Sequence, residues 1–176
     1  MSSIEKYLES FGKYVVQQAR TNLTKGKKNV TNELYNSIKF TVTPNSEGYN
    51  VSFSMDSYGE FVDKGVSGNK KIQEFTTFDG RKIESPFKYR SKQPPANILS
   101  KWISMRGIKG RDKKSGRYIT NLSLAFLIGK KIKRDGIKSL SFFQRPLGLG
   151  LKRLPNDIMI AIKEDILNNL KTITAR

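Results

Sequence analysis

The chain is organised around the stretch Tyr58-Gly59-Glu60-Phe61-Val62-Asp63-Lys64-Gly65. It is predicted to form two turns of helix, because Tyr58, Phe61 and Val62 recur at the i, i+3, i+4 spacing of a buried face. Gly65 is expected just beyond the helix end, where glycine adopts a left-handed backbone at little steric cost. This short helix is expected to join a preceding hairpin to the basic sequence that follows; an ordinary packing helix without a special role is the alternative.

An amphipathic helix and a β-hairpin are predicted upstream of this stretch. Apolar residues recur with helical period over residues 3–24, and Ser2 or Ser3 is a suitable N-cap. From Ile38 the period changes to two, and two alternating runs flank the turn residues 45–48. The first helix is expected to cover the apolar face of this hairpin, with Phe11 buried between them.

The downstream sequence is more polar and is broken by glycine and proline. Residues 72–78 and 82–87 are candidate short strands within an exposed, mobile arm at 66–93. Helices are predicted over 96–106 and 121–134, on either side of a basic glycine loop at 108–118. A strand over 139–143, a close-packed turn over 145–150 and a helix starting near Pro155 are expected next. The apolar residues of this last helix are Ile158, Ile162, Ile166, Leu167 and Leu170.

These elements predict a single α+β domain over residues 1–176. We expect a small antiparallel β-sheet packed by N-terminal and C-terminal amphipathic helices, with an extended basic arm. A chain of 176 residues is long enough to bury a substantial core.

The net charge of +18 is unevenly distributed along the chain. Residues 1–63 contain seven Lys/Arg and seven Asp/Glu, whereas residues 64–117 contain fifteen and four, a net of +11. This asymmetry indicates a surface that contacts phosphates or an acidic protein partner, the alternative being a merely soluble basic surface. The candidate contact residues lie in the basic loop and on the helix after it: Lys109, Arg111, Lys113, Lys114, Arg117, Lys130, Lys131, Lys133 and Arg134.

The residues that most catalytic and metal sites require are absent. With no cysteine and no histidine, the chain lacks thiolate ligands, the usual zinc and copper ligands and the common nucleophile–base dyads. Glu164 and Asp165 are adjacent on a helix and point apart, and the spacing of Asp79 and Glu84 fits no established nuclease pattern. We therefore expect no catalysis, metal or cofactor. No apolar run is long enough for a membrane span, and the N-terminus does not resemble a signal peptide.

The order of these parts resembles the tail-completion or neck (head–tail joining) proteins of tailed bacteriophages. The resemblance rests on the aromatic–Gly–Glu–Phe–Val–acidic–x–Gly segment at 58–65, a Pro-Pro helix with a central Trp, and the Phe-x-x-Pro segment at 143–146. The family often has Thr where this chain has Val66, and the 66–93 arm is longer than a minimal member needs. The residues expected to pack the family motifs are Tyr58, Phe61, Val62, Gly65, Phe143 and Pro146.

The resemblance implies a structural virion protein that forms a homo-oligomeric ring where the phage head or portal joins the tail. Its implied partners are other connector, portal or tail proteins, with non-specific contact to genomic DNA, and its assembly takes place in the host cytoplasm. The alternative is a stand-alone basic nucleic-acid-binding protein, which would be a monomer or dimer with high DNA affinity. A small metal-dependent nuclease that uses Asp79 is a third interpretation.

Overall fold

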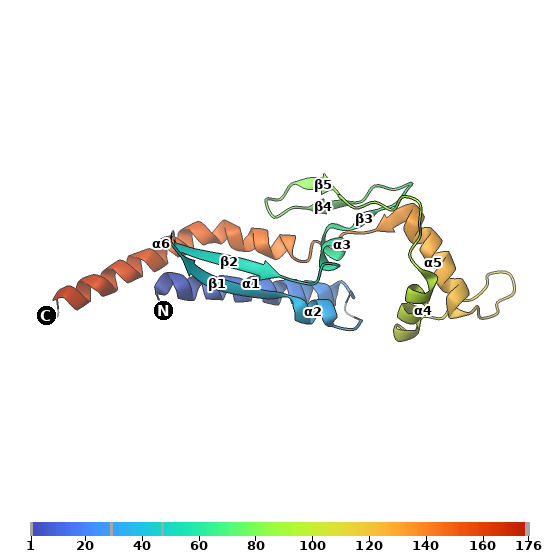
Figure 1. Cartoon of the computed structure of the whole chain (residues 1–176), viewed down its shortest axis with the longest axis horizontal. Coiled ribbons are helices and arrows are strands. Elements are labelled where there is room, and N and C mark those ends of the chain that lie inside the picture. Colours follow the sequence, from blue (N-terminus) through green and yellow to red (C-terminus); the bar gives the residue numbers. More distant parts are fainter. Residues whose placement is uncertain (1, 29, 47, 175–176) are drawn as a thin grey trace.

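The computed structural model describes residues 2–28, 30–46 and 48–174, with side chains of the last helix described as far as residue 166. Helices and small antiparallel sheets alternate along the chain, as the α+β prediction required (Figure 1). The elements are α1 (Ser3–Lys25), α2 (Glu33–Ser37), β1 (Lys39–Asn45), β2 (Gly48–Ser54), α3 (Gly59–Lys64), β3 (Val66–Ser67), β4 (Glu74–Thr76), β5 (Lys82–Glu84), α4 (Ala96–Met105), α5 (Asn121–Asp135), β6 (Gly136–Ile137) and α6 (Gln144–Thr174).

The predicted first helix is confirmed and packs against both the β1–β2 hairpin and α6 (Figure 1). The Ser2 side chain caps it by accepting the Glu5 N–H at 3.1 Å. From α6, the Asp165 carboxylate accepts the Ser3 N–H at 2.9 Å, which satisfies another free amide of the first turn. The buried face of α1 is made by Leu8, Phe11, Gly12, Val15, Val16, Ala19 and Leu23.

The β1–β2 hairpin is also confirmed, with Phe40 opposite Phe53 in the antiparallel register. The Phe53 ring lies edge-on to Phe11 of α1, with ring centroids 6.2 Å apart, and to Phe143, with centroids 5.4 Å apart. These aromatic contacts bring α1, the hairpin and the start of α6 into one core, which a two-stranded sheet needs for stability.

The last helix differs from the sequence-based prediction. It begins at Gln144, so Pro155 lies inside it, the expected turn over 145–150 is helical, and residues 139–143 form no strand. Pro146 sits in the first turn, where its missing N–H has no intrahelical partner to lose. Gly150 faces the Phe11 ring, where a Cβ would lie 2.6 Å from the nearest ring carbon. The glycines of 145–150 therefore provide close helix packing instead of a turn. Leu167 and Leu170 lie outside the residues whose side chains are described.

The segment expected to be an exposed arm is partly built into the fold. Its predicted hairpin forms, although β4 and β5 have only three residues each. At its base β3 pairs with β6, and Val66, Ser67 and Phe75 are buried. Beyond this hairpin, α4 and α5 pack on each other and project at the end of the molecule opposite the C-terminal half of α6 (Figure 1).

Candidate functional site

One buried carboxylate joins two of the three segments on which the sequence resemblance rests. Asp63, at the end of α3, is only 3% exposed. Its Oδ1 accepts the Phe143 N–H at 2.8 Å and the Gln144 N–H at 3.5 Å. Asp63 thus caps the N-terminus of α6 from 80 residues away in the chain, where free amides and the helix dipole favour a negative charge.

The backbone around Asp63 makes further contacts with the segment that precedes α6. The main-chain carbonyl of Asp63 accepts the Ser141 N–H at 2.9 Å and the Ser139 hydroxyl at 2.7 Å. Gly65 adopts φ +73°, and a Cβ there would lie 2.7 Å from the Ser139 nitrogen. Glycine is therefore required at this position both by its backbone conformation and by the closeness of the backbone of residues 137–139. The expectation that Gly65 ends the helix is confirmed.

Burial and hydrogen bonding act in opposite directions on this carboxyl. Burial raises the pKa of Asp63 above its ordinary value of 3.8, and the bonds from the Phe143 and Gln144 amides oppose that shift. The folded chain therefore holds this proton more tightly than the unfolded chain does.

The predicted buried face of α3 is wrong. Tyr58 and Phe61 are 41% and 44% exposed, and the buried residues of α3 are Gly59 and Asp63. Gly59 is buried and packs closely on Met55, since a Cβ at Gly59 would lie 2.7 Å from the Met55 sulfur. A larger residue at this position would push α3 away from Met55. Phe61 instead lies against the Phe87 ring, with centroids 4.5 Å apart.

Of the other motif residues, Val62, Phe143 and Pro146 do contribute to packing. Val62 and Phe143 are partly buried against the core, and Pro146 is fully buried. Tyr58 and Phe61 were wrongly predicted to be buried. Helical spacing shows which residues share a face of a two-turn helix, but it does not show which face packs against the rest of the chain.

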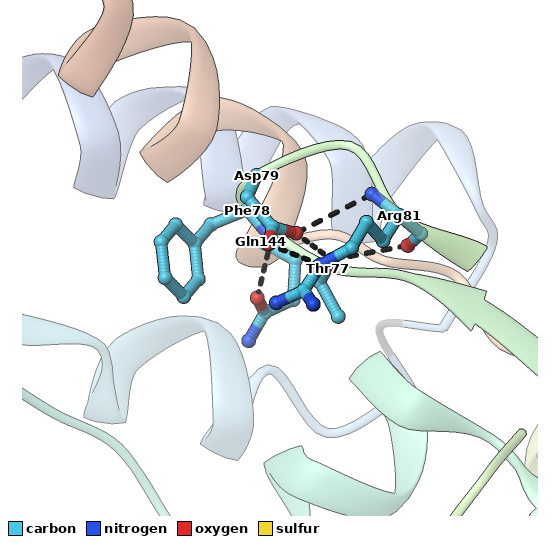
Figure 2. Close-up of polar contacts among 5 residues, drawn as sticks. All are labelled: Thr77, Phe78, Asp79, Arg81 and Gln144. Atoms are coloured by element: carbon cyan, nitrogen blue, oxygen red, sulfur yellow. Dashed lines mark hydrogen bonds and ion pairs between the residues drawn. The ribbon is translucent and has the colours of Figure 1, made fainter. Parts of the chain in front are cut away.

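The β4–β5 turn lies over the first turn of α6 (Figure 2). The Phe78 N–H donates to the Gln144 Oε1 at 3.0 Å. Within the turn, Asp79 pairs with Arg81 and accepts the Thr77 hydroxyl, a bond that contributes most to lowering the pKa of Asp79. The Asp79 carboxylate is therefore occupied by its own turn, which does not favour the nuclease interpretation.

The predicted basic loop projects between α4 and α5 and is held by its own hydrogen bonds. Asp112 accepts the Lys114 N–H at 3.0 Å and the Ser115 N–H at 2.8 Å, and the bonds from Ser115 and Lys114 lower the pKa of Asp112. The Arg111 guanidinium stacks on the Tyr118 ring, 4.4 Å from its centroid. All five predicted basic residues of the loop are exposed: Lys109, Arg111, Lys113, Lys114 and Arg117.

The four predicted basic residues of α5 lie toward the other end of that helix, about 14 Å or more along its axis from its first residue at 1.5 Å per residue. Two of them have partners: Lys133 donates to the Ser91 carbonyl at 2.6 Å, and Arg134 pairs with Asp135 at 2.7 Å. Lys130 lies over the Phe126 ring, 4.8 Å from its centroid, and Lys131 is exposed. The nine predicted residues therefore form two separate groups.

Two lysines that were not predicted from the sequence, Lys70 and Lys71, lie beside the basic residues at the end of α5. The Lys70 N–H donates to the Arg134 carbonyl at 3.0 Å. The hydrogen bond from Arg134 lowers the pKa of Asp135, and the nearby charges of Lys131 and Lys71 lower it further. Lys70 and Lys71 reach this position through the β3–β6 pairing. Because those strands have two residues each, their pairing leaves no periodic signal in the sequence.

An apolar surface borders the basic loop. Leu122, Phe126 and Leu127 of α5 are 58%, 47% and 55% exposed. With the loop residues Arg111, Lys113 and Lys114 they line an open groove of about 970 Å³. Such a surface, apolar at its floor and basic at its rim, can bind a partner that is apolar and acidic.

Among the residues that the structure describes, no helix is both long and apolar enough to cross a membrane. The same residues include no group of three or more Asp, Glu, His or Cys side chains that could hold a metal ion. Comparisons with protein-family models, curated proteins and solved structures found no match to this chain.

Proposed function

We propose that this chain is a structural neck or tail-completion protein of a tailed bacteriophage. It assembles as a homo-oligomeric ring at the joint between head and tail and contacts connector, portal or tail proteins. It resides in the virion after assembly in the host cytoplasm, and it performs no catalysis. Its basic surface faces the genomic DNA or an acidic neighbouring ring.

The Asp63 junction is the observation that carries this proposal. Two of the three segments that carry the resemblance to neck proteins, 58–65 and 143–146, are short and far apart in the chain. The 2.8 Å hydrogen bond from the Phe143 N–H to Asp63 brings both segments into one buried contact. Two chance matches would have no reason to meet around a single carboxylate, so this contact supports treating them as one motif.

A complementation experiment in the phage that encodes the chain tests the proposal. With an amber codon in the gene, we expect filled heads and separate tails to accumulate in electron micrographs, and wild-type protein from a plasmid to restore complete particles. Asp63→Ala should restore far fewer particles. The matched control is Asp79→Ala, which removes a carboxylate from an exposed turn. Complete, infectious particles in the absence of the protein would contradict the proposal.

The exposed basic loop favours the stand-alone nucleic-acid-binding protein as the second candidate. For a neck protein, DNA binding should be weak, equal for unrelated duplexes and steeply dependent on salt, because each neutralised phosphate releases counterions with a slope of about −0.9. The replacements Lys113→Gln, Lys114→Gln and Arg117→Gln should flatten that slope for every duplex. A preference above about 10³-fold for one sequence would support the second candidate instead.

A further inference from the structure

A large basic surface lies where the projecting α4–α5 pair joins the rest of the molecule (Figure 1). The fold brings three segments together there: residues 69–71, 88–92 and 130–138. They contain ten Lys/Arg and a single acidic side chain, Asp135, and we call them the basic patch. All ten basic side chains except Lys133 are exposed. Because the segments are distant in the chain, this concentration of charge is a property of the fold.

Hydrogen bonds hold the three segments beside one another. The Arg134 carbonyl, at the end of α5, accepts the Lys70 N–H at 3.0 Å. The Lys133 ammonium donates to the Ser91 carbonyl at 2.6 Å, which fastens residues 88–92 to the same end of α5. The basic side chains therefore project from a backbone that is already ordered, and a ligand that binds them loses little affinity to backbone ordering.

Few acidic side chains offset this charge. Asp135 already has an ion-pair partner within the patch. The acidic residues nearest to the patch in the sequence are Glu74 and Glu84, which lie opposite each other on β4 and β5. On α3, Glu60 pairs with Lys64 at 3.6 Å. Even with Glu74 and Glu84 included, ten basic side chains stand against three acidic ones.

The composition of the basic patch differs from that of the surface around the basic loop. Among the described residues, the large apolar side chains that are exposed include none from the three segments, and Ile72 only borders them. The loop, in contrast, borders the exposed side chains of Leu122, Phe126 and Leu127. Protein–protein interfaces have a centre that is depleted of charge, whereas protein–DNA interfaces are polar and strongly positive. The patch therefore has the composition of a DNA-binding surface, and the loop region that of a protein-binding surface.

The density of positive charge also suits a duplex better than an acidic polypeptide. Double-stranded DNA carries one negative charge per about 1.7 Å of its axis, whereas an extended acidic chain carries at most one per about 3.3–3.6 Å. We propose that the basic patch is the main DNA-binding site of this chain and contacts the phosphate backbone of a duplex without reading its sequence. The inference rests on the neck function proposed above, and it names DNA as the partner that this surface faces.

Two variants that each lose three lysines test the assignment, and both lower the net charge of +18 by the same amount. The patch variant carries Lys70→Gln, Lys71→Gln and Lys131→Gln. The control carries Lys13→Gln, Lys152→Gln and Lys163→Gln, which replace exposed lysines of α1 and α6 outside the patch. Fluorescence anisotropy measures binding to two unrelated labelled duplexes between about 50 and 200 mM salt.

The patch variant should show a salt slope shallower by about 2–3, at about 0.9 per lost phosphate contact, and at least about 30-fold weaker binding at about 0.1 M salt. The control should bind both duplexes like wild type. The loop variant described above should lose less affinity than the patch variant. Replacing the three patch lysines with arginine should retain wild-type binding, because the charge is kept, and circular dichroism verifies that every variant is folded.

Poly-glutamate serves as the acidic-protein probe and should displace the duplex only at a higher concentration of charges. Equal losses in the patch variant and the control would show that only net charge matters and would overturn the inference. A larger loss in the loop variant, or equal competition by poly-glutamate, would also overturn it. So would a wild type that binds neither duplex at about 50 mM salt. Each of these results would leave the neck proposal standing, because the amber mutant tests it separately.

Discussion

Replacing Gly148 of α6 with alanine tests whether the β4–β5 turn lies directly on this helix. A Cβ at Gly148 would lie 2.0 Å from the Phe78 carbonyl oxygen, closer than any real contact. Gly129 of α5 is the matched control. It is also inside a helix, but its Cβ would lie 3.4 Å from the Pro94 carbonyl oxygen, an ordinary contact distance.

The expected effects on the free energy of unfolding have opposite signs. Alanine inside a helix is more stable than glycine by about 0.5–1 kcal/mol, so Gly129→Ala should stabilise by about that amount. At Gly148 the backbone of Phe78 must move, and its N–H is bonded to Gln144 at 3.0 Å. Overpacking costs about 1–3 kcal/mol and a lost hydrogen bond about 1 kcal/mol more. The helix-propensity gain of about 0.5–1 kcal/mol offsets part of this cost, so Gly148→Ala should destabilise by about 1–3 kcal/mol in total.

Urea denaturation followed by circular dichroism measures both changes, and thermal melting provides a second readout. At about 2–4 °C per kcal/mol for a chain of this size, the melting temperature should fall for Gly148→Ala and rise slightly for Gly129→Ala. A Gly148→Ala chain as stable as wild type would refute the packing of the turn on α6. Equal destabilisation by both variants would show that the two glycines share some other role.

The core, the cap of α6 and the interior proline of α6 each give a distinct expected outcome. Phe11→Ala should cost about 3–5 kcal/mol in denaturant titrations, because this side chain is buried against Phe53, and a loss below about 1 kcal/mol would place it on the surface. Burial raises the pKa of Asp63 above 3.8, so the folded state binds the proton more tightly and wild-type stability should fall, relative to Asp63→Asn, as the pH rises above that value. If the free energies of unfolding of wild type and Asp63→Asn changed equally with pH, the raised pKa of Asp63 would be contradicted. Pro155→Ala should stabilise by about 1–3 kcal/mol if α6 is continuous, whereas a loss of stability would indicate a helix that begins at the proline.

The elements predicted correctly from the sequence are those whose signals are local. Helix α1 has a helical stripe and a capping Ser2, and the β1–β2 hairpin has two alternating runs on either side of a polar turn. Helix α5 likewise starts after the capping Thr120. Each of these patterns is complete within one stretch of chain, so no distant contact is needed to interpret it.

The errors came from residues whose role depends on a distant part of the chain. Gly148 and Gly150 were predicted to lie in a turn. In the structure they lie in α6, where they allow Phe78 and Phe11 to approach the helix closely. Pro155 was predicted to start a helix, but it lies inside α6. The helix packs on α1 both before and after Pro155, and this packing outweighs the free-energy cost of a proline inside a helix. Tyr58 and Phe61, which are 41% and 44% exposed, were predicted as core for the same reason.

At the candidate site, the contact of Asp63 with residues 143 and 144 is the clearest case of a role that depends on a distant part of the chain. An acidic residue near the end of α3 has no local partner that would mark it as buried, and its partners are amides from residues 143 and 144. Sequence reasoning singled out both segments by their resemblance to one family but treated them as separate packing motifs. Their contact could not be deduced, because backbone N–H groups carry no residue-type signal.

The distribution of charge follows the division of the molecule into a packed layer and projecting elements. Eight buried apolar side chains of the described core lie within the first 63 residues, whose net charge is zero, and only three lie within residues 64–117, whose net charge is +11. Repulsion among like charges opposes a compact fold, and it is weakest where side chains project into solvent. The basic segments therefore hold few of the buried apolar side chains of the described core. A partner with negative charge, whether DNA or an acidic protein, would relieve the repulsion.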